Sequence, residues 1–323
     1  MSTTAAAIPP RLRGGTWGTG LVILAAWLLL IVATALVRDD FLSQQTLLAI
    51  AFRMSVIGVL AVGQALVAIS GGFLDLSQPA AMILSSLILV RLMEAGTPTI
   101  VVIGAAILAG GLFGLTNGAI IVIGKINPVV VTLATNFIGL AALFLIFTQA
   151  QVPIGSDLYA LGRQNFHGLP FIWFPMMALI LTVGFFVPRT IRGRHAIAVG
   201  GNKMAAAARG ISLRKTRFAA FGASGAAAGL AAVLFAASSG PFNSSSANTL
   251  LLPAIAAVIL AGISLAGGRG SISLLVLSVG FLATVPTSLV FFGFSSDWQL
   301  LVQGSILVVA VAVDGYRYRR VTP

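Results

Sequence analysis

The sequence contains no cysteine and few charged residues. The absence of cysteine excludes disulfide bonds and thiolate metal sites. Charged residues make up 8% of the chain and hydrophobic residues 58%, a composition too apolar for a water-soluble globule and typical of a membrane protein. The net charge of +12 must therefore be read by the position of each charge relative to a bilayer, and it does not indicate a nucleic-acid partner.

Residues that could carry out chemistry are also scarce. His167 and His195 fall in expected loops with no carboxylate at helical spacing, so we expect neither a metal site nor a proton relay. The chain has no G-x-x-x-x-G-K-[ST] motif, its nearest approach being "GKI" at residues 124–126. Any ATP must therefore bind to another protein. We expect no catalytic residue, no covalent chemistry and no cofactor.

Long apolar runs, each bounded by glycine, proline or charge, occupy most of the chain. An α-helix needs about 20 residues to cross about 30 Å of hydrocarbon, so 323 residues leave room for about ten spans. The segment 53–93 also fits a broken or re-entrant helix in place of two simple spans. The runs predict an all-α polytopic membrane protein of about ten transmembrane helices, at residues 18–37, 47–69, 77–93, 99–123, 128–148, 171–188, 216–238, 250–266, 271–292 and 298–313.

Basic residues are distributed unevenly between the two sides of these spans. With the N-terminus inside, 15 of the 19 Lys and Arg residues fall on the cytoplasmic side, which predicts an N-in, C-in orientation. We expect cytoplasmic tails at residues 1–17 and 314–323, on either side of a single transmembrane domain at 18–313. Residues 18–37 are interpreted as a retained first span rather than a signal peptide, because no convincing cleavage site follows them.

The chain can be divided into two halves of opposite topology. The segment from Leu47 enters the membrane from outside, and the segment from Thr216 enters from inside. Each half contains a glycine-interrupted stretch, "ISGGFLDLS" in the first and "LAGISLAGGRGSI" in the second. Paired interruptions of this kind are typical of inverted-repeat transporters, where they lie beside a pathway at the bilayer midplane.

The large cytoplasmic loop at residues 189–215 is basic and contains no acid. Its alanine run favours a short helix, with a turn at residues 200–201 before it, Asn202 as the N-cap and Gly210 as the C-terminal stop. The loop fits a contact with anionic lipid or a plain topology signal, and equally a coupling helix docked in a partner that supplies energy. The candidate coupling residues are Arg194, Gly200, Gly201, Asn202, Arg209 and Gly210.

Five stretches resemble, in the same order, the permease subunits of ribose-type ABC sugar importers. They are "SGGFLDLS", "GKINPVVVTLATNFIGLAALFLI", the loop at 189–215, "AIAAVILAGISLAGGRGSI" and "GFSSDWQLLVQGSILVVAVAVD". The resemblance implies a type II-like permease fold in the cytoplasmic (inner) membrane, paired with a second copy or a paralogous permease. It also implies a cytoplasmic ABC ATPase subunit and a periplasmic or lipid-anchored solute-binding protein.

The function implied by this resemblance is ATP-driven import of a monosaccharide, such as ribose, xylose or galactose, or of a related polyol. Two alternatives stay open: a permease of the same superfamily for nucleosides or branched-chain amino acids, and an ATP-independent secondary transporter or facilitator. The second is disfavoured because Asp75 is nearly the only carboxylate at membrane depth.

Three positions depart from the family pattern. In the coupling loop, the family usually has acidic residues followed by Ala-Ala-Arg, whereas this chain has Lys203, Met204 and Ala207. The charge of the contact with the ATPase should therefore differ. Residues 251–253 and 286–288 replace polar residues that are frequent in the family. We therefore expect either a substrate with fewer hydroxyl groups than ribose or a different partner permease that supplies the polar side.

Polar residues inside the apolar runs are the candidates for the translocation pathway, because an unpaired polar group at membrane depth is costly. For Gln64 and Asn117, hydrogen bonding between helices is the favoured alternative. For Asp75 and Ser77, it is capping of the third span after the glycine break. The candidates for the pathway or helix break are Gln64, Gly71, Gly72, Asp75, Ser77, Asn117 and Asn136.

Several other residues are assigned packing or surface roles. Glycines at 110, 114 and 118 form one helical stripe suited to close packing, as do those at 225 and 229. Pro128 and Pro253 are expected in the first turns of helices. Arg91 and Glu94 are expected to form a solvated ion pair. Arg269, at the inner turn before the ninth span, fits a topology charge or a contact with the ATPase.

Overall fold

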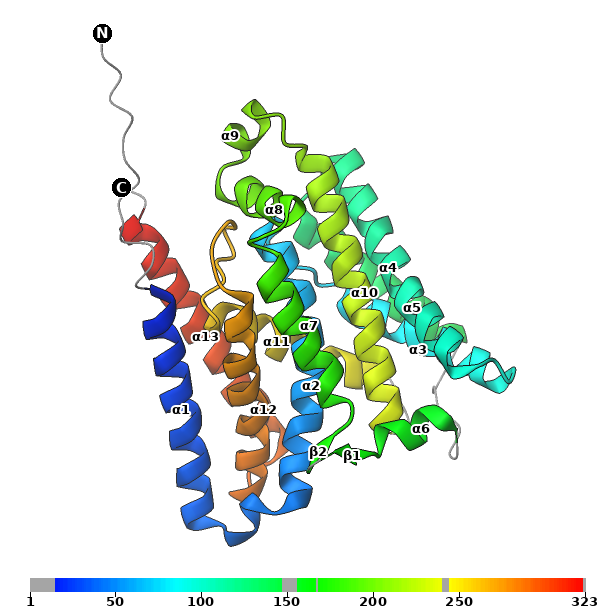
Figure 1. The fold of residues 1–323 in the computed structure, drawn as a ribbon, viewed down its shortest axis with the longest axis vertical. Helices are drawn as coiled ribbons and strands as arrows, with labels where there is room; N and C mark the ends of the chain where they lie inside the picture. Colours follow the sequence, from blue (N-terminus) through cyan, green and yellow to red (C-terminus); the bar gives the residue numbers. More distant parts are fainter. Residues whose placement is uncertain (1–14, 147–155, 167, 240–243, 322–323) are drawn as a thin grey trace.

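The computed structural model describes residues 15–146, 156–166, 168–239 and 244–321 (Figure 1). A two-residue hairpin pairs β1 (Asn165–Phe166) with β2 (Leu169–Pro170), and two short 3-10 turns are η2 (Asp39–Leu42) and η3 (Ile272–Leu274). The helices are α1 (Gly15–Val37), α2 (Gln44–Ile69), α3 (Gln78–Glu94), α4 (Thr99–Gly124), α5 (Pro128–Ile146), α6 (Asp157–Gly162), α7 (Trp173–Phe186), α8 (Ile191–Gly201), α9 (Lys203–Ala208), α10 (Leu213–Ser239), α11 (Ser244–Leu260), α12 (Leu275–Phe291) and α13 (Ser296–Val321).

A helix lies in each of the ten apolar runs, and the chain is a predominantly helical, multi-pass membrane protein. Six described helices are long and apolar enough to cross a membrane alone: α1, α2, α4, α10, α12 extended by η3, and α13. The pair α7 and α8, bent by 76°, is a seventh candidate. The helices α3 and α11 have only 17 residues each.

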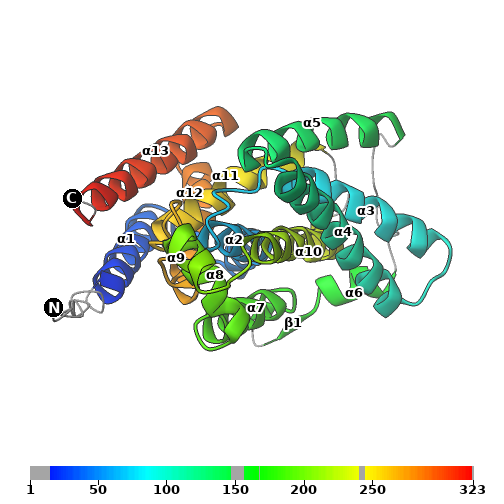
Figure 2. The same cartoon turned by 90° about the horizontal axis from the view of Figure 1, so that it is seen from above.

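Helix α2 is at the centre of the bundle and α10 packs beside it (Figure 2). The expected glycine stripe is confirmed in the contact between α4 and α10. A Cβ added at Gly110 would meet the carbonyl oxygen of Gly225, and one added at Gly114 would meet that of Phe221. Only glycine lets the two backbones approach this closely, so the stripe is a packing surface.

Two sequence expectations about proline have different outcomes. Pro128 begins α5, as expected. Pro253 was wrongly expected in a first turn, since it lies inside α11. That helix begins at Ser244, in a polar segment that a search for apolar runs does not include, and membrane helices tolerate the backbone hydrogen bond that proline removes. The expected span 250–266 is therefore misplaced, because α11 begins and ends six residues earlier, at Ser244 and Leu260, and residues 261–271 form a glycine-rich turn.

The loop at 189–215 contains two helices rather than one. The turn expected at Gly200 and Gly201 is wrong, because both residues end α8, whose N-terminus is capped by the Thr190 hydroxyl accepting the N–H of Gly193 at 3.2 Å. His195 consequently lies in this helix and not in a loop. His167 is outside the described residues. The exposed ion pair of Arg91 and Glu94 is confirmed, at 3.0 Å.

Helix α1 lies at the edge of the bundle against α12. The indole N–H of Trp27 donates to the Thr284 hydroxyl at 2.9 Å, and the same ring covers Gly280, where a Cβ would collide with it. Helix α13 packs on α11 and α12. The helices α1 and α13 therefore lie on either side of α12 (Figure 2).

Candidate functional site

The candidate site is centred on the break between α2 and α3, residues 70–77. Helix α2 ends in a glycine cap, in which the N–H of Gly71 bonds the carbonyl of Ala68 at 2.9 Å and the N–H of Gly72 bonds that of Val67 at 3.0 Å. Gly71 has a φ of 72°, which suits this left-handed position. The chain then turns back along α2, so that the Gln78 amide donates to the carbonyl of Leu60 at 3.1 Å.

Gln64 holds the returning chain against α2. Its amide nitrogen donates to the backbone carbonyl of Asp75 at 2.6 Å, and its amide oxygen accepts the N–H of Asp75 at 3.0 Å. The same nitrogen also donates to the Gln78 side chain at 3.0 Å. Both backbone groups of Asp75 are thereby paired without a helix, as the apolar surroundings require.

The Asp75 carboxylate is buried and directed at the start of α3. Its Oδ1 accepts both the N–H of Ser77, at 3.0 Å, and the Ser77 hydroxyl, at 2.6 Å. Ser77 occupies the N-cap position of α3, but its own side chain makes no capping bond. Asp75 therefore provides the cap, because its carboxylate accepts the backbone N–H of the residue two positions later. Asp75 Oδ2 has no hydrogen-bond partner among the described residues.

Helices α4, α5 and α10 also contact the break. Asn117 on α4 donates to the Ser77 hydroxyl at 2.7 Å, and Asn136 on α5 accepts the N–H of Ala80 at 3.1 Å. All five polar candidates from the sequence are thus brought together in one buried network. Their contacts are the interhelical bonds expected for Gln64 and Asn117, and a role in the pathway stays a prediction.

Three further polar residues complete this network, and the sequence analysis missed them. The Thr132 hydroxyl accepts the N–H of Leu76 at 3.1 Å. The Gln78 amide donates to the Ser224 hydroxyl of α10 at 3.1 Å. Each of the three is a polar residue inside or beside an apolar run, which is the signal that selected the other candidates.

The caps expected in the coupling loop are confirmed. The Asn202 side chain accepts the N–H of Ala205 at 3.0 Å and so caps α9. At the other end, Gly210 has a φ of 75°, and the N–H of Ile211 bonds the carbonyl of Ala206 at 3.0 Å. Arg194 and Arg209 are exposed.

Gly200 places α8 in contact with two non-helical segments. A Cβ at this position would meet the carbonyl oxygen of Ile69, at the end of α2, and the backbone nitrogen of Gly268. The N–H of Gly268 itself donates to the Ile69 carbonyl at 2.9 Å. A guanidinium nitrogen of Arg217 on α10 donates to the Gly71 carbonyl at 3.2 Å. We call this set of contacts around Ile69, Gly71, Gly200 and Gly268 the glycine junction.

The glycine junction corrects one expectation. The stretches "ISGGFLDLS" and "LAGISLAGGRGSI" meet at the same end of the bundle, whereas equivalent segments of inverted halves would lie at opposite ends. Pairing these two stretches as inverted-repeat counterparts was therefore wrong. The sequence showed a glycine interruption in each half but could not show which end of the bundle each one occupies.

The charges at this end of the molecule are basic. Partial burial, and secondly the nearby Arg217, lower the pKa of Lys203 in α9.

The described residues contain no group of three His, Cys, Asp or Glu side chains that could hold a metal ion.

Comparison with known proteins identifies relatives along nearly the whole chain. The L-arabinose ABC transporter permease protein of Azospirillum brasilense is 30% identical, over 98% of this chain and 94% of that protein. The ribose import permease protein of Bacillus subtilis is 29% identical, over 88% and 89%. The L-arabinose transport system permease protein of Escherichia coli is 31% identical, over 92% and 90%. No solved structure gives a significant match.

A family model also matches residues 46–311, which include the break, the coupling loop and the glycine junction. Its description is the permease component of the branched-chain amino acid transport system. The resemblance to sugar ABC importer permeases, expected from five sequence blocks, is confirmed by the relatives. The chain belongs to this family of membrane transport permeases.

Proposed function

We propose that this chain is the membrane-spanning permease of an ATP-driven importer for a monosaccharide or a related small polyol. The observation that carries the proposal is similarity over 88–98% of the chain to permeases named for arabinose and ribose. Such a permease forms the pathway and performs no covalent chemistry, so ATP hydrolysis takes place on a separate subunit.

The proposed topology is ten membrane-crossing segments with both tails, 1–17 and 314–323, in the cytoplasm and residues 18–313 in the inner membrane. The beginning of α1 and the end of α13 lie at the same end of the bundle as α8 and α9 (Figure 1). This end carries the basic loop at 189–215, and positive charge favours the cytoplasmic side. Helices α2 and α10 run in opposite directions, as halves of opposite topology require.

The proposed contact with the cytoplasmic ATPase is formed by α8 and α9. Around α9, Met204 is 82% exposed, and Asn202 and Lys203 are also exposed, so this surface is available to a partner. The glycine junction connects it to the end of α2 and to the turn after α11. Movement of α8 would therefore be transmitted directly to the break at residues 70–77.

The proposed pathway lies between this chain and a second permease, which is a copy or a paralogue. A solute-binding protein delivers sugar at the membrane face opposite to α8 and α9. Helices α5 and α13 lie on one side of the bundle with α11 between them (Figure 2). Both present exposed apolar side chains, such as Ile138 and Val308, each 68% exposed. A second permease on this side would enclose a pathway lined by α5, α11 and α13.

The test is transport by the purified complex in liposomes, with the ATPase and binding protein of the same system. We expect ATP-dependent uptake of radiolabelled arabinose or ribose. Leucine serves as the competing substrate, because the family description names branched-chain amino acids. Uptake of leucine but neither sugar would refute the substrate class, and sugar uptake by the isolated chain without ATP would refute the importer mechanism. Native mass spectrometry of the same complex would count the permease copies.

A further inference from the structure

Two basic side chains lie against the glycine that caps α2. A guanidinium nitrogen of Arg217 on α10 donates to the Gly71 carbonyl at 3.2 Å. The Cε atom of Lys203 on α9 lies 3.6 Å from the position that a Cβ at Gly71 would take. Two positive charges from different helices therefore converge on the glycine junction.

These two charges have no opposite charge beside them in the described part of the chain. No Asp or Glu occurs in residues 158–296, which supply α8, α9, α10 and the turn after α11. Asp75 is the acid closest to Gly71 in the sequence, but it is buried at the break, bonds Ser77 and forms no ion pair with either cation. The Nε atom of Arg217 is buried without a hydrogen-bond partner.

The two cations also disfavour each other. Besides partial burial, the positive charge of Arg217 lowers the pKa of Lys203, as a like charge at short distance does. A carboxylate beside both side chains would replace this repulsion with attraction. Carboxylates form short, charge-assisted hydrogen bonds with both ammonium and guanidinium groups. The site is therefore suited to an acid supplied from outside the chain.

The position of α9 favours a protein as the source of this acid. Helix α9 lies beyond the ends of α2 and α12, which places it outside the bilayer in the proposed orientation (Figure 1). Lys203 is exposed, and the adjacent Met204 is 82% exposed. Methionine is enriched at protein interfaces, so the charged and the apolar side chain together form a surface for a cytoplasmic protein.

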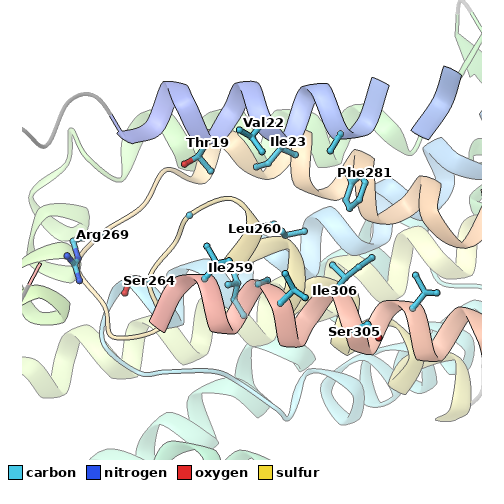
Figure 3. A pocket seen from close by; sticks show the side chains of 16 residues that line it. Thr19, Val22, Ile23, Ile259, Leu260, Ser264, Arg269, Phe281, Ser305 and Ile306 are labelled. Atoms are coloured by element: carbon cyan, nitrogen blue, oxygen red, sulfur yellow. The ribbon is translucent and has the colours of Figure 1, made fainter. Parts of the chain in front are cut away.

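A groove between α1 and α13 is less suited to such a partner. Ser264, in the turn after α11, lies at one end of it (Figure 3). Its walls are mainly apolar and include Val22, Phe281 and Ile306. Walls of this kind suit hydrocarbon better than a charged group, so we place the acidic partner at α9 and not in this groove.

We infer that a carboxylate of the cytoplasmic ATPase subunit binds beside Lys203 and Arg217, with Met204 as the apolar neighbour of this contact. The inference rests on the proposed function, because it requires that partner. Since both cations lie against Gly71, the carboxylate connects the ATPase to the cap of α2. Movement of the ATPase is then transmitted to the break at residues 70–77 by charge as well as by α8.

Carbodiimide crosslinking of the complex with the ATPase of the same system, in phosphatidylcholine nanodiscs, tests the chemistry of the partner. The reagent activates a carboxylate, a neighbouring lysine amine displaces it as a urea, and an amide bond forms at the carboxylate carbon. The chain has only three lysines, at positions 125, 203 and 215, so mass spectrometry can assign each crosslink. We expect an amide between Lys203 and an Asp or Glu of the ATPase. A complex that forms without this crosslink would overturn the inference.

Variants at Lys203 separate the charge from the shape of the side chain. Lys203→Gln should weaken binding of the purified ATPase to the full chain in nanodiscs about tenfold, the lower end of measured couplings between close charge pairs across an interface. Lys203→Glu should weaken binding further, because it repels the carboxylate. Lys203→Arg should bind nearly as well as the unchanged chain. The control Lys125→Gln removes the same charge at the end of α4 and should leave the affinity unchanged.

A double variant tests whether the two cations share one carboxylate. If they do, Lys203→Gln and Arg217→Gln together should cost less affinity than the sum of their separate losses. Additive losses would contradict the shared carboxylate. If Arg217→Gln does not fold, the Lys203 variants and the crosslink still decide.

The remaining outcomes separate this inference from the proposed function. Equal affinity of Lys203→Gln and the unchanged chain would overturn the inference alone. A loss that appears only when phosphatidylglycerol is added to the nanodiscs would also overturn it, with a lipid headgroup as the anion. Failure of the unchanged chain to bind the ATPase at all would refute the proposed function itself.

Discussion

The side-chain amide of Gln64 forms two hydrogen bonds with the backbone of Asp75, as donor at 2.6 Å and as acceptor at 3.0 Å. Eleven positions separate the two residues in the sequence. Gln64 thus supplies to the returning chain the two partners that a helix would have supplied internally. This relationship allows the chain to be non-helical at residues 70–77 within an apolar bundle.

Gln64→Leu should lower the thermal unfolding temperature of the detergent-solubilised protein. The change leaves the N–H and C=O of Asp75 buried without partners, at a cost of about 1–3 kcal/mol for each group. The control is Gln45→Leu on the same helix, at an exposed position, which should change the temperature little. Equal effects of both variants would show that the amide of Gln64 is not needed to hold the break.

Asp75→Asn and Asp75→Ala should differ. Asparagine keeps an oxygen that can accept from the N–H and hydroxyl of Ser77, so the protein should retain its yield and thermal stability. Alanine removes that acceptor and should cost about 1–3 kcal/mol. Transport by Asp75→Asn in the reconstituted complex then measures the role of the charge alone. Normal stability with normal transport would mean that the charge has no direct function.

Gly200→Ala should uncouple ATP hydrolysis from transport. The added methyl group meets the Ile69 carbonyl and the nitrogen of Gly268, so α8 must move away from the glycine junction. Overpacking of this kind costs about 1–3 kcal/mol, and we expect about a tenfold loss of ATP-driven uptake. Binding of the ATPase, measured by co-purification, should persist because the exposed residues 202–204 around α9, which form the other part of the proposed contact, are unchanged.

The neighbouring residue provides the matched control. A methyl group at Gly201 would have no atom within 4 Å, so Gly201→Ala should transport normally. If Gly201→Ala lost as much uptake as Gly200→Ala, the loss would come from the stiffness of the helix end and not from the junction.

Gly114→Ala should weaken the packing of α4 on α10. Its methyl group would meet the Phe221 carbonyl, and the two helices must separate at a cost of about 1–3 kcal/mol. Gly104→Ala lies on the same helix with no atom within 4 Å of the added group, so it controls for the change in helix propensity. Thermal unfolding in detergent should show a lower temperature for Gly114→Ala only. A lower temperature for both variants would contradict the packing role of the stripe.

Local features of the chain could be predicted from the sequence because they depend on neighbouring residues. The caps at Asn202 and Gly210 and the ion pair of Arg91 and Glu94 involve residues at most five apart. The glycine stripe in α4 follows from helical spacing alone. The errors at Pro253 and at the turn before Asn202 have a common cause: polar residues at the start of α11 and two glycines at the end of α8 are helical although their residue types do not favour helix.

The composition and order of the residues by themselves determined that this chain lies in a membrane, where its apolar runs fall and which family it resembles. These properties depend only on the hydrophobicity of each segment and on the order of the motifs along the chain. Only the tertiary structure decided that Gln64, Asp75, Ser77, Asn117 and Asn136 form one network, and that Gly200 contacts both glycine-rich segments. Polar groups in an apolar bundle must find partners, but which partners they find depends on helices up to 146 positions apart that pack side by side.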